Sequence, residues 1–183
     1  MSIRAIIGTV AVLAGFAVLE RSVDASTGQA GSCKPTQAYA TLHPGDRILV
    51  RAQPTPEAPV LGVISAGTTA DLTTATVTMN SSLSGWARIG LKSAQDYTAL
   101  DAATAPAFGW IPADQLAVDT RVDGAITTYS RPSLMGVVTG KIEHKDEKFR
   151  VLGCRGELLQ VINAGRGNTW IDKWCSKADG CRS

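Results

Sequence analysis

The chain has 183 residues, of which 44% are hydrophobic and 19% are charged, and its 18 basic and 16 acidic residues leave a net charge of +2. This composition excludes a collagen-like chain and a highly charged disordered chain, because aliphatic residues are plentiful and the charges nearly balance. It also argues against a nucleic-acid partner, which normally goes with a strong basic excess or a basic stripe.

The first 25 residues have the pattern of a secretory signal peptide. A short start containing Arg4 precedes the uncharged, apolar residues 5–19, and Val23-Asp24-Ala25 has the small residues of a cleavage site. The alternative is a retained membrane anchor, but spanning a bilayer takes about 20 apolar residues. We therefore expect cleavage after Ala25, and a periplasmic or secreted protein with no transmembrane anchor after processing.

All four cysteines lie in the mature chain, namely Cys33, Cys154, Cys175 and Cys181. In an oxidising compartment an even number of cysteines favours disulfide bonds, here two. A metal site would need closely spaced ligand pairs, and a catalytic thiol would need a base to activate it. Neither pattern is present in the sequence, so we expect no metal, no cofactor and no catalytic residue. Spacing alone leaves all three pairings of the cysteines open.

The order of short apolar stretches predicts a mostly β chain. Residues 26–37 are small and polar, with Pro35 and two glycines, and we expect a flexible lead-in over 26–41. Turn residues then separate short apolar or β-branched stretches up to residue 118, and the alanine-rich residues 94–105 are the best helical candidate. The strands expected in this first module, 42–118, are 47–51, 60–64, 70–79, 86–89 and 109–111.

The same order of elements recurs after residue 119. It predicts a second module, 124–175, followed by a C-terminal tail, 176–183, with the two modules folding largely independently about a joint near 118–123. The mixed-charge residues 141–148 are typical of an exposed hairpin tip. The strands expected in the second module are 126–132, 136–142, 149–152, 157–161 and 169–171.

The order of motifs resembles the bacterial SH3-like (SH3b) domain. The first module carries it as Leu49-Val50-Arg51, Val60-Leu61-Gly62, Gly67, Gly85-Trp86 and Gly109-Trp110-Ile111. The second module carries it as Arg131-Pro132, Val137-Val138-Thr139-Gly140, Val151-Leu152-Gly153-Cys154 and Thr169-Trp170-Ile171. The resemblance implies two tandem small SH3-like β-barrels in an exported protein that binds cell-wall or protein ligands. The sequence departs from the SH3b pattern in two places: residues 91–108 form a long connection where such domains have a short turn, and Glu157-Leu158 replaces the expected Gly-Trp.

The resemblance also bears on the disulfide pairing. Related modules often carry a second cysteine that pairs with the equivalent of Cys154, but Leu159 stands in that place here. We therefore expect Cys154 to bond to Cys175 or Cys181 and to fix the short polar tail, with Cys33 taking the remaining cysteine. The competing pairing joins Cys175 to Cys181 and forces Cys33 onto Cys154.

The candidate ligand-binding residues are aromatic residues and arginines at strand positions. A tryptophan there either packs the barrel or offers an indole face to an extended peptide or a sugar. An arginine beside it can pair with a carboxylate of a wall peptide, although scattered surface arginines are more often merely solvated. The candidates are Arg51, Trp86, Trp110, Tyr129, Arg131 and Trp170.

These features together predict an exported, non-catalytic binding module that recognises a cell-wall peptide or glycan, or an envelope protein. The alternative is a structural or regulatory accessory subunit of an envelope complex. A peptidoglycan-cleaving enzyme is the least favoured interpretation, because the sequence has no G-x-S-x-G, H-E-x-x-H or Cys-His constellation.

Overall fold

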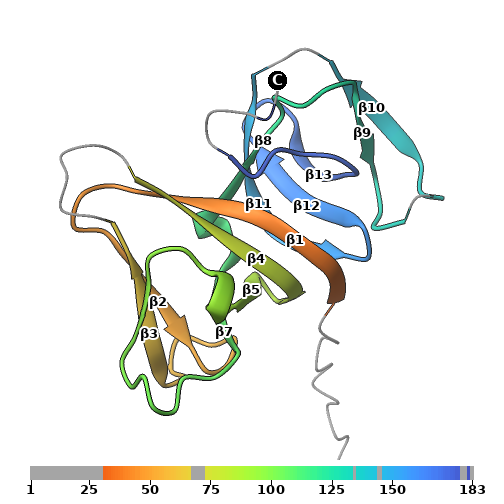
Figure 1. Cartoon of the computed structure of the whole chain (residues 1–183). Coiled ribbons are helices and arrows are strands. Elements are labelled where there is room, and N and C mark those ends of the chain that lie inside the picture. The colour runs from red at the N-terminus through yellow and green to blue at the C-terminus, as the bar shows by residue number, and fades with distance from the viewer. Residues whose placement is uncertain (1–30, 67–72, 134, 144–145, 178–180, 182–183) are drawn as a thin grey trace, which may run out of the picture.

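The computed structural model describes residues 31–66, 73–133, 135–143, 146–177 and 181. The predicted signal peptide, the first residues of the lead-in (26–30), Gly67 and part of the C-terminal tail lie outside the described residues, as does His144 in the expected hairpin tip. The described residues form thirteen strands and two short 3-10 turns (Figure 1). The predicted mostly β class is confirmed.

The strands of the first half are β1 (Gly31–Leu42), β2 (Arg47–Arg51), β3 (Val60–Ser65), β4 (Thr73–Leu83), β5 (Trp86–Gly90), β6 (Tyr97–Ala99) and β7 (Phe108–Pro112). The strands that follow are β8 (Leu116–Asp119), β9 (Ile126–Tyr129), β10 (Val138–Ile142), β11 (Lys148–Arg155), β12 (Leu158–Asn163) and β13 (Gly167–Ile171). The 3-10 turns are η1 (Leu91–Ser93) and η2 (Ala113–Gln115).

These strands pair as one continuous antiparallel sheet rather than as two closed barrels. Its order is β10-β9-β13-β12-β11-β8-β1-β4-β5-β7-β2-β3-β6. Among the described residues the two ends of this order, β10 and β6, are not paired to each other, so the sheet is open. The expected closure into two barrels is therefore not observed. The outer edges of β4 and β11 pair instead with β1 and β8, which connect the two halves.

The two halves nevertheless repeat one strand order. The run β4-β5-β7-β2-β3 in the first half has the same order as β11-β12-β13-β9-β10 in the second. The irregularities recur as well: the register shifts once in the β4–β5 pair, between Met79 and Ser81, and once at the matching place of the β11–β12 pair, between Val151 and Gly153. Bulges are specific local devices, so a matched bulge indicates the same backbone path in both halves.

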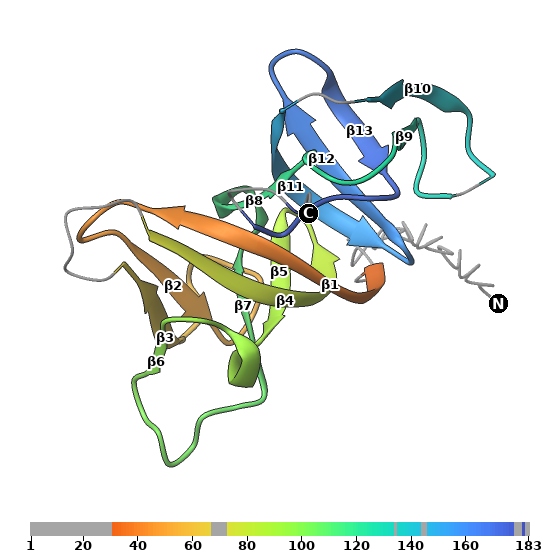
Figure 2. The ribbon, with the colours of Figure 1, turned by 45° about the horizontal axis from the view of Figure 1, so that its top comes forward.

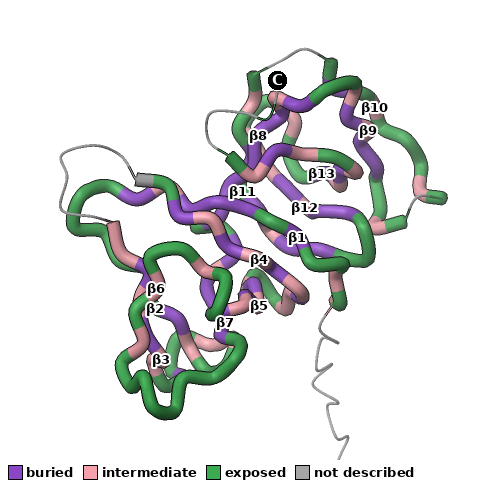
Figure 3. Tube along the Cα trace, in the orientation of Figure 1, coloured by how far each residue is buried: buried purple, intermediate pink, exposed green. Residues whose placement is uncertain are grey.

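Two strands that the sequence analysis did not predict join the halves (Figure 2). Residues 31–41 are not a flexible lead-in, because they form most of β1, which pairs with β4 on one side and β8 on the other. The first residues of the joint expected near 118–123 belong to β8, which lies between β1 and β11 and has all four of its residues buried. One hydrophobic core runs through both halves (Figure 3).

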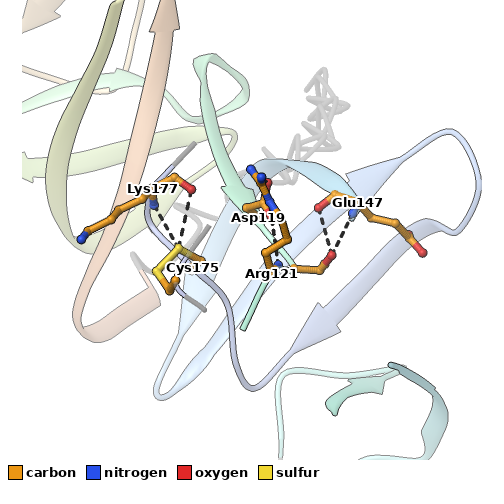
Figure 4. A network of polar contacts seen from close by, with 7 residues as sticks. Asp119, Arg121, Glu147, Cys175 and Lys177 are labelled. Atoms are coloured by element: carbon orange, nitrogen blue, oxygen red, sulfur yellow. Dashed lines mark hydrogen bonds and ion pairs between the residues drawn. A yellow bond between two sulfur atoms is a disulfide. The ribbon is translucent and has the colours of Figure 1, made fainter. Parts of the chain in front are cut away.

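The described part of the C-terminal tail is held against β8. Asp119 and Cys175 exchange two backbone hydrogen bonds, of 2.9 and 2.8 Å, and the Cys181 amide donates to the Arg121 carbonyl at 2.8 Å. The buried Asp119 carboxylate accepts bonds from the Arg121 guanidinium at 3.0 Å (Figure 4). Next to it, the Thr120 amide donates to the Glu147 carbonyl at 3.0 Å. Cys175 and Cys181 are therefore attached to β8 and to the residues that follow it.

The disulfide bonds correct the expected pairing. The structure contains Cys33–Cys154 and Cys175–Cys181, with Cα–Cα distances of 5.7 and 5.5 Å. The first bond forms because the start of β1 lies beside the β11–β12 turn, where the Lys34 amide donates to the Gly156 carbonyl at 2.8 Å. The prediction that Cys154 bonds to Cys175 or Cys181 is wrong, because Cys175 is held at Asp119 by backbone hydrogen bonds and forms its disulfide with Cys181.

The best helical candidate of the sequence, residues 94–105, does not form a helix. Tyr97–Ala99 instead forms the short edge strand β6, which pairs with β3. A Cβ on Gly62 of β3 would collide with the Thr98 carbonyl and lie 2.6 Å from the Tyr97 ring, so the glycine allows the close approach of β6. The unpaired edge of β3 outweighs the helical preference of the alanines here, as tertiary contacts often do.

We predict that removing the two disulfides has unequal effects. The Cys33–Cys154 bond closes a loop with a sequence separation of 121, whereas Cys175–Cys181 has a separation of 6. By the loop-entropy relation, serine replacement of Cys33 and Cys154 should lower the free energy of unfolding by about 5 kcal/mol. Serine replacement of Cys175 and Cys181 should lower it by about 2 kcal/mol. Denaturant titration of both double variants measures this. Equal losses, or a Cys154 peptide linked to the tail in non-reducing mapping, would contradict the account.

We also predict where a protease cuts first. Residues 100–107 are exposed and contain several alanines, whereas residues 116–120 are buried in the sheet. Elastase, which cleaves after small residues, should therefore cut 100–107 before 116–120, because cleavage needs the backbone to leave its hydrogen bonds. N-terminal sequencing of the first fragments tests the order. An initial cut within 116–120 would show that β8 is an accessible linker.

Candidate functional site

The first half presents aromatic side chains and an arginine on the outer face of β5 and β7. Burial alternates along both strands. Ala87 of β5 and Ile111 of β7 face the core, and the residues on either side of each in its strand face outward. The outward residues form what we call the aromatic face: Trp86, Arg88, Phe108 and Trp110.

Contacts within the aromatic face are specific. Arg88 lies opposite Trp110 across the β5–β7 pair, and its guanidinium carbon lies 4.1 Å from the centroid of the Phe108 ring. Phe108 is 40% exposed, so one side of this cation–π pair is open to solvent. Trp86 and Trp110 are half-buried. Each ring therefore rests against the sheet and keeps part of its surface accessible.

Arg51 reaches the aromatic face from β2, opposite Trp110. Its Nη1 donates to the Ala58 carbonyl at 2.7 Å and holds the proline-containing loop between β2 and β3. This predicted ligand-binding residue thus has a structural partner, the Ala58 carbonyl. Sequence reasoning placed Arg51, Trp86 and Trp110 among the candidates and the structure brings them together, whereas it did not select Phe108.

The other three candidates lie in the second half. Trp170 is half-buried and lies opposite Tyr129 across the β13–β9 pair, as Trp110 lies opposite Arg51. The Tyr129 ring is only 8% exposed, and its hydroxyl donates to the Asp172 carboxylate at 3.4 Å. Arg131 follows β9 and is exposed. Six strands separate β13 from β7 in the sheet order, so the candidates form two groups.

A groove that sequence reasoning missed lies between the halves. This central groove, of about 490 Å³, is lined by residues of the β1–β2 turn, of η2 and β8, and of β11. Beside it lies a second cavity of about 470 Å³, lined by Lys148, Arg150, Ile162, Asn163 and Ala164. Lys148 and Arg150 of β11 line both, and both volumes are in the range of small-molecule sites. The central groove is lined by Thr41, Leu42, Asp46, Arg47, Ile48, Asp114, Gln115, Leu116, Ala117, Lys148 and Arg150.

A buried tyrosine lies beneath the cations of the groove. The Lys148 ammonium is 5.6 Å from the centroid of the Tyr39 ring, and Tyr39 is fully buried with no hydrogen-bond partner for its hydroxyl among the described residues. Burial raises the pKa of Tyr39 to about 12, and the negative charge of Asp119 acts in the same direction against the opposing effect of Arg121. Tyr39 is therefore neutral at physiological pH.

The described residues contain no cluster of three or more histidine, cysteine or carboxylate side chains that could hold a metal ion. None of their helices is long and apolar enough to cross a membrane. No family model matches the chain, and no curated protein shows significant similarity to it.

We predict that Tyr39→Phe changes the pH dependence of stability. At neutral pH it should leave the free energy of unfolding unchanged or raise it, because the variant removes an unpaired buried hydroxyl. Above about pH 10 the unfolded chain releases the tyrosine proton while the folded chain keeps it, so the wild type should lose stability relative to the variant. Denaturant titrations from about pH 9 to about pH 11 measure the difference. If the free energies of unfolding of the wild type and the variant changed in parallel over this pH range, the raised pKa of Tyr39 would be refuted.

Proposed function

We propose that this protein is an exported, non-catalytic binding module of the cell envelope, and that the aromatic face binds a peptide or glycan of the cell wall. The observation that carries the proposal is the solvent-open pair of Arg88 and Phe108 with two tryptophans beside it. Aromatic rings provide flat apolar surfaces for sugar rings and peptide planes, and a guanidinium pairs with carboxylates.

Comparison of the halves supports a ligand role for the aromatic face. The strand pairings match Trp86 with Leu158, Arg88 with Gln160 and Phe108 with Asn168. At three of the four positions of the aromatic face, the second half therefore has a side chain that is neither aromatic nor charged. Core residues, by contrast, stay buried and apolar in both halves. The matched core pairs are Ala87 and Leu159, Ile89 and Val161, and Ile111 and Ile171. At three of the four positions the aromatic or charged side chain is therefore specific to the first half.

The two disulfides support export, because such bonds persist in oxidising compartments. The signal-peptide pattern of residues 1–25 leads to the same compartment. In the second candidate function, an accessory subunit of an envelope complex, the aromatic face would instead contact a protein.

Sedimentation with purified, insoluble peptidoglycan tests the proposal. The mature protein should co-sediment, and the double variant Arg88→Gln/Phe108→Ser should lose about tenfold in affinity, because both the stacking surface and the charge are removed. The matched control is Gln160→Ala/Asn168→Ala, which removes the equivalent pair, held in the second half by a 3.1 Å hydrogen bond. The control should bind like the wild type.

Two outcomes would contradict the proposal. Failure of the wild type to sediment with peptidoglycan, together with capture of one envelope protein through the aromatic face, would favour the accessory subunit. Equal losses in the double variant and its control would show that the aromatic face has no special role.

A further inference from the structure

We infer that the central groove and the cavity beside it form a second binding site, which takes an elongated ligand carrying carboxylate or phosphate groups. The site is independent of the aromatic face. It is formed where the two halves meet, from segments far apart in the sequence (the β1–β2 turn, η2 with β8, and β11).

The position of Arg150 follows from the sheet register. One row of paired residues crosses the sheet from β1 to β12, and Arg150 lies in it between Ala117 of β8 and Ile162 of β12. Lys148 lies two residues earlier on the same outward face, since Phe149 between them is fully buried. The two cations therefore form a ridge with a cavity on either side.

The cations of the groove have no ionic partner in the described part of the chain. Arg47, Lys148 and Arg150 are exposed and form no ion pair with a described residue. Arg166 and Arg121, by contrast, bind Glu147 and Asp119 through two guanidinium nitrogens each. An oxyanion is the natural partner for an unpaired guanidinium, because its fork of N–H donors matches carboxylate and phosphate oxygens.

The carboxylates of the lining set where the anion binds. Asp46 and Asp114 line the central groove, and the Asp46 side chain accepts the His43 amide at 2.9 Å within its turn. The second cavity has no carboxylate among its described lining residues. Glu147 lies nearby, hydrogen-bonded to Asn163, and Arg166 balances its charge. The anionic groups should therefore lie along the Lys148 and Arg150 ridge and extend into the second cavity.

Calorimetric titration of the mature protein with tripolyphosphate and with tri-glutamate tests the inference. Binding of either probe, weakened by added salt, supports the site, and the probe that binds identifies phosphate or carboxylate as the preferred group. Arg150→Gln should lower the affinity about tenfold and Lys148→Gln severalfold. The matched control is Arg155→Gln, which removes an exposed arginine of the same strand that lines neither cavity.

No measurable binding of either probe, or equal losses in Arg150→Gln and Arg155→Gln, would overturn the inference. The Arg88→Gln/Phe108→Ser variant should bind each probe with the same affinity as the wild type does. That result separates this site from the aromatic face, so that failure of one proposal leaves the other testable.

Discussion

The burial of β8 between β1 and β11 is the constraint on which the rest of the structure depends. This strand ends the first repeat and leads into the second, and its hydrogen bonds on both edges turn two repeats into one sheet. The same strand receives the C-terminal segment through Asp119 and Cys175. The Cys33–Cys154 bond acts beside it, because it fastens the start of β1 to the end of β11. The central groove exists only because these segments meet.

Most strands of the two repeats could be predicted from the sequence, because alternating apolar residues and turn signals are local properties. Residues 47–51, for example, form β2 as expected. The start of β1 could not be predicted, because its small residues and Pro35 have the composition of a loop. These residues belong to a strand only because β4 pairs with the residues on either side of an irregularity between Ser32 and Thr36. The disulfide pairing and the central groove were missed for the same reason: both depend on contacts between segments far apart in the sequence. The aromatic face was found in part, because Trp86 and Trp110 are conspicuous in the sequence, whereas Phe108 becomes notable only beside Arg88.

The repeats show how one backbone path can support different surfaces. Their register shifts match, so corresponding outward positions can be compared directly. Where the first half stacks Arg88 on Phe108, the second half joins Gln160 to Asn168 by a hydrogen bond. Inward positions keep their apolar character because both repeats contribute to one core. A fold sets these positions, and the side chains placed on them determine what each half can bind.

The central claim is that the two halves form one cooperative unit through β1 and β8. Native-state hydrogen exchange in increasing denaturant tests it most directly, since it reports the free energy at which each segment opens. The account predicts that the amides of Tyr39, Ala117 and Val151 exchange through the same global unfolding event, with one free energy and one denaturant dependence. Exchange of the β1 and β8 amides at a distinctly lower free energy, followed by separate unfolding of the two halves, would contradict it.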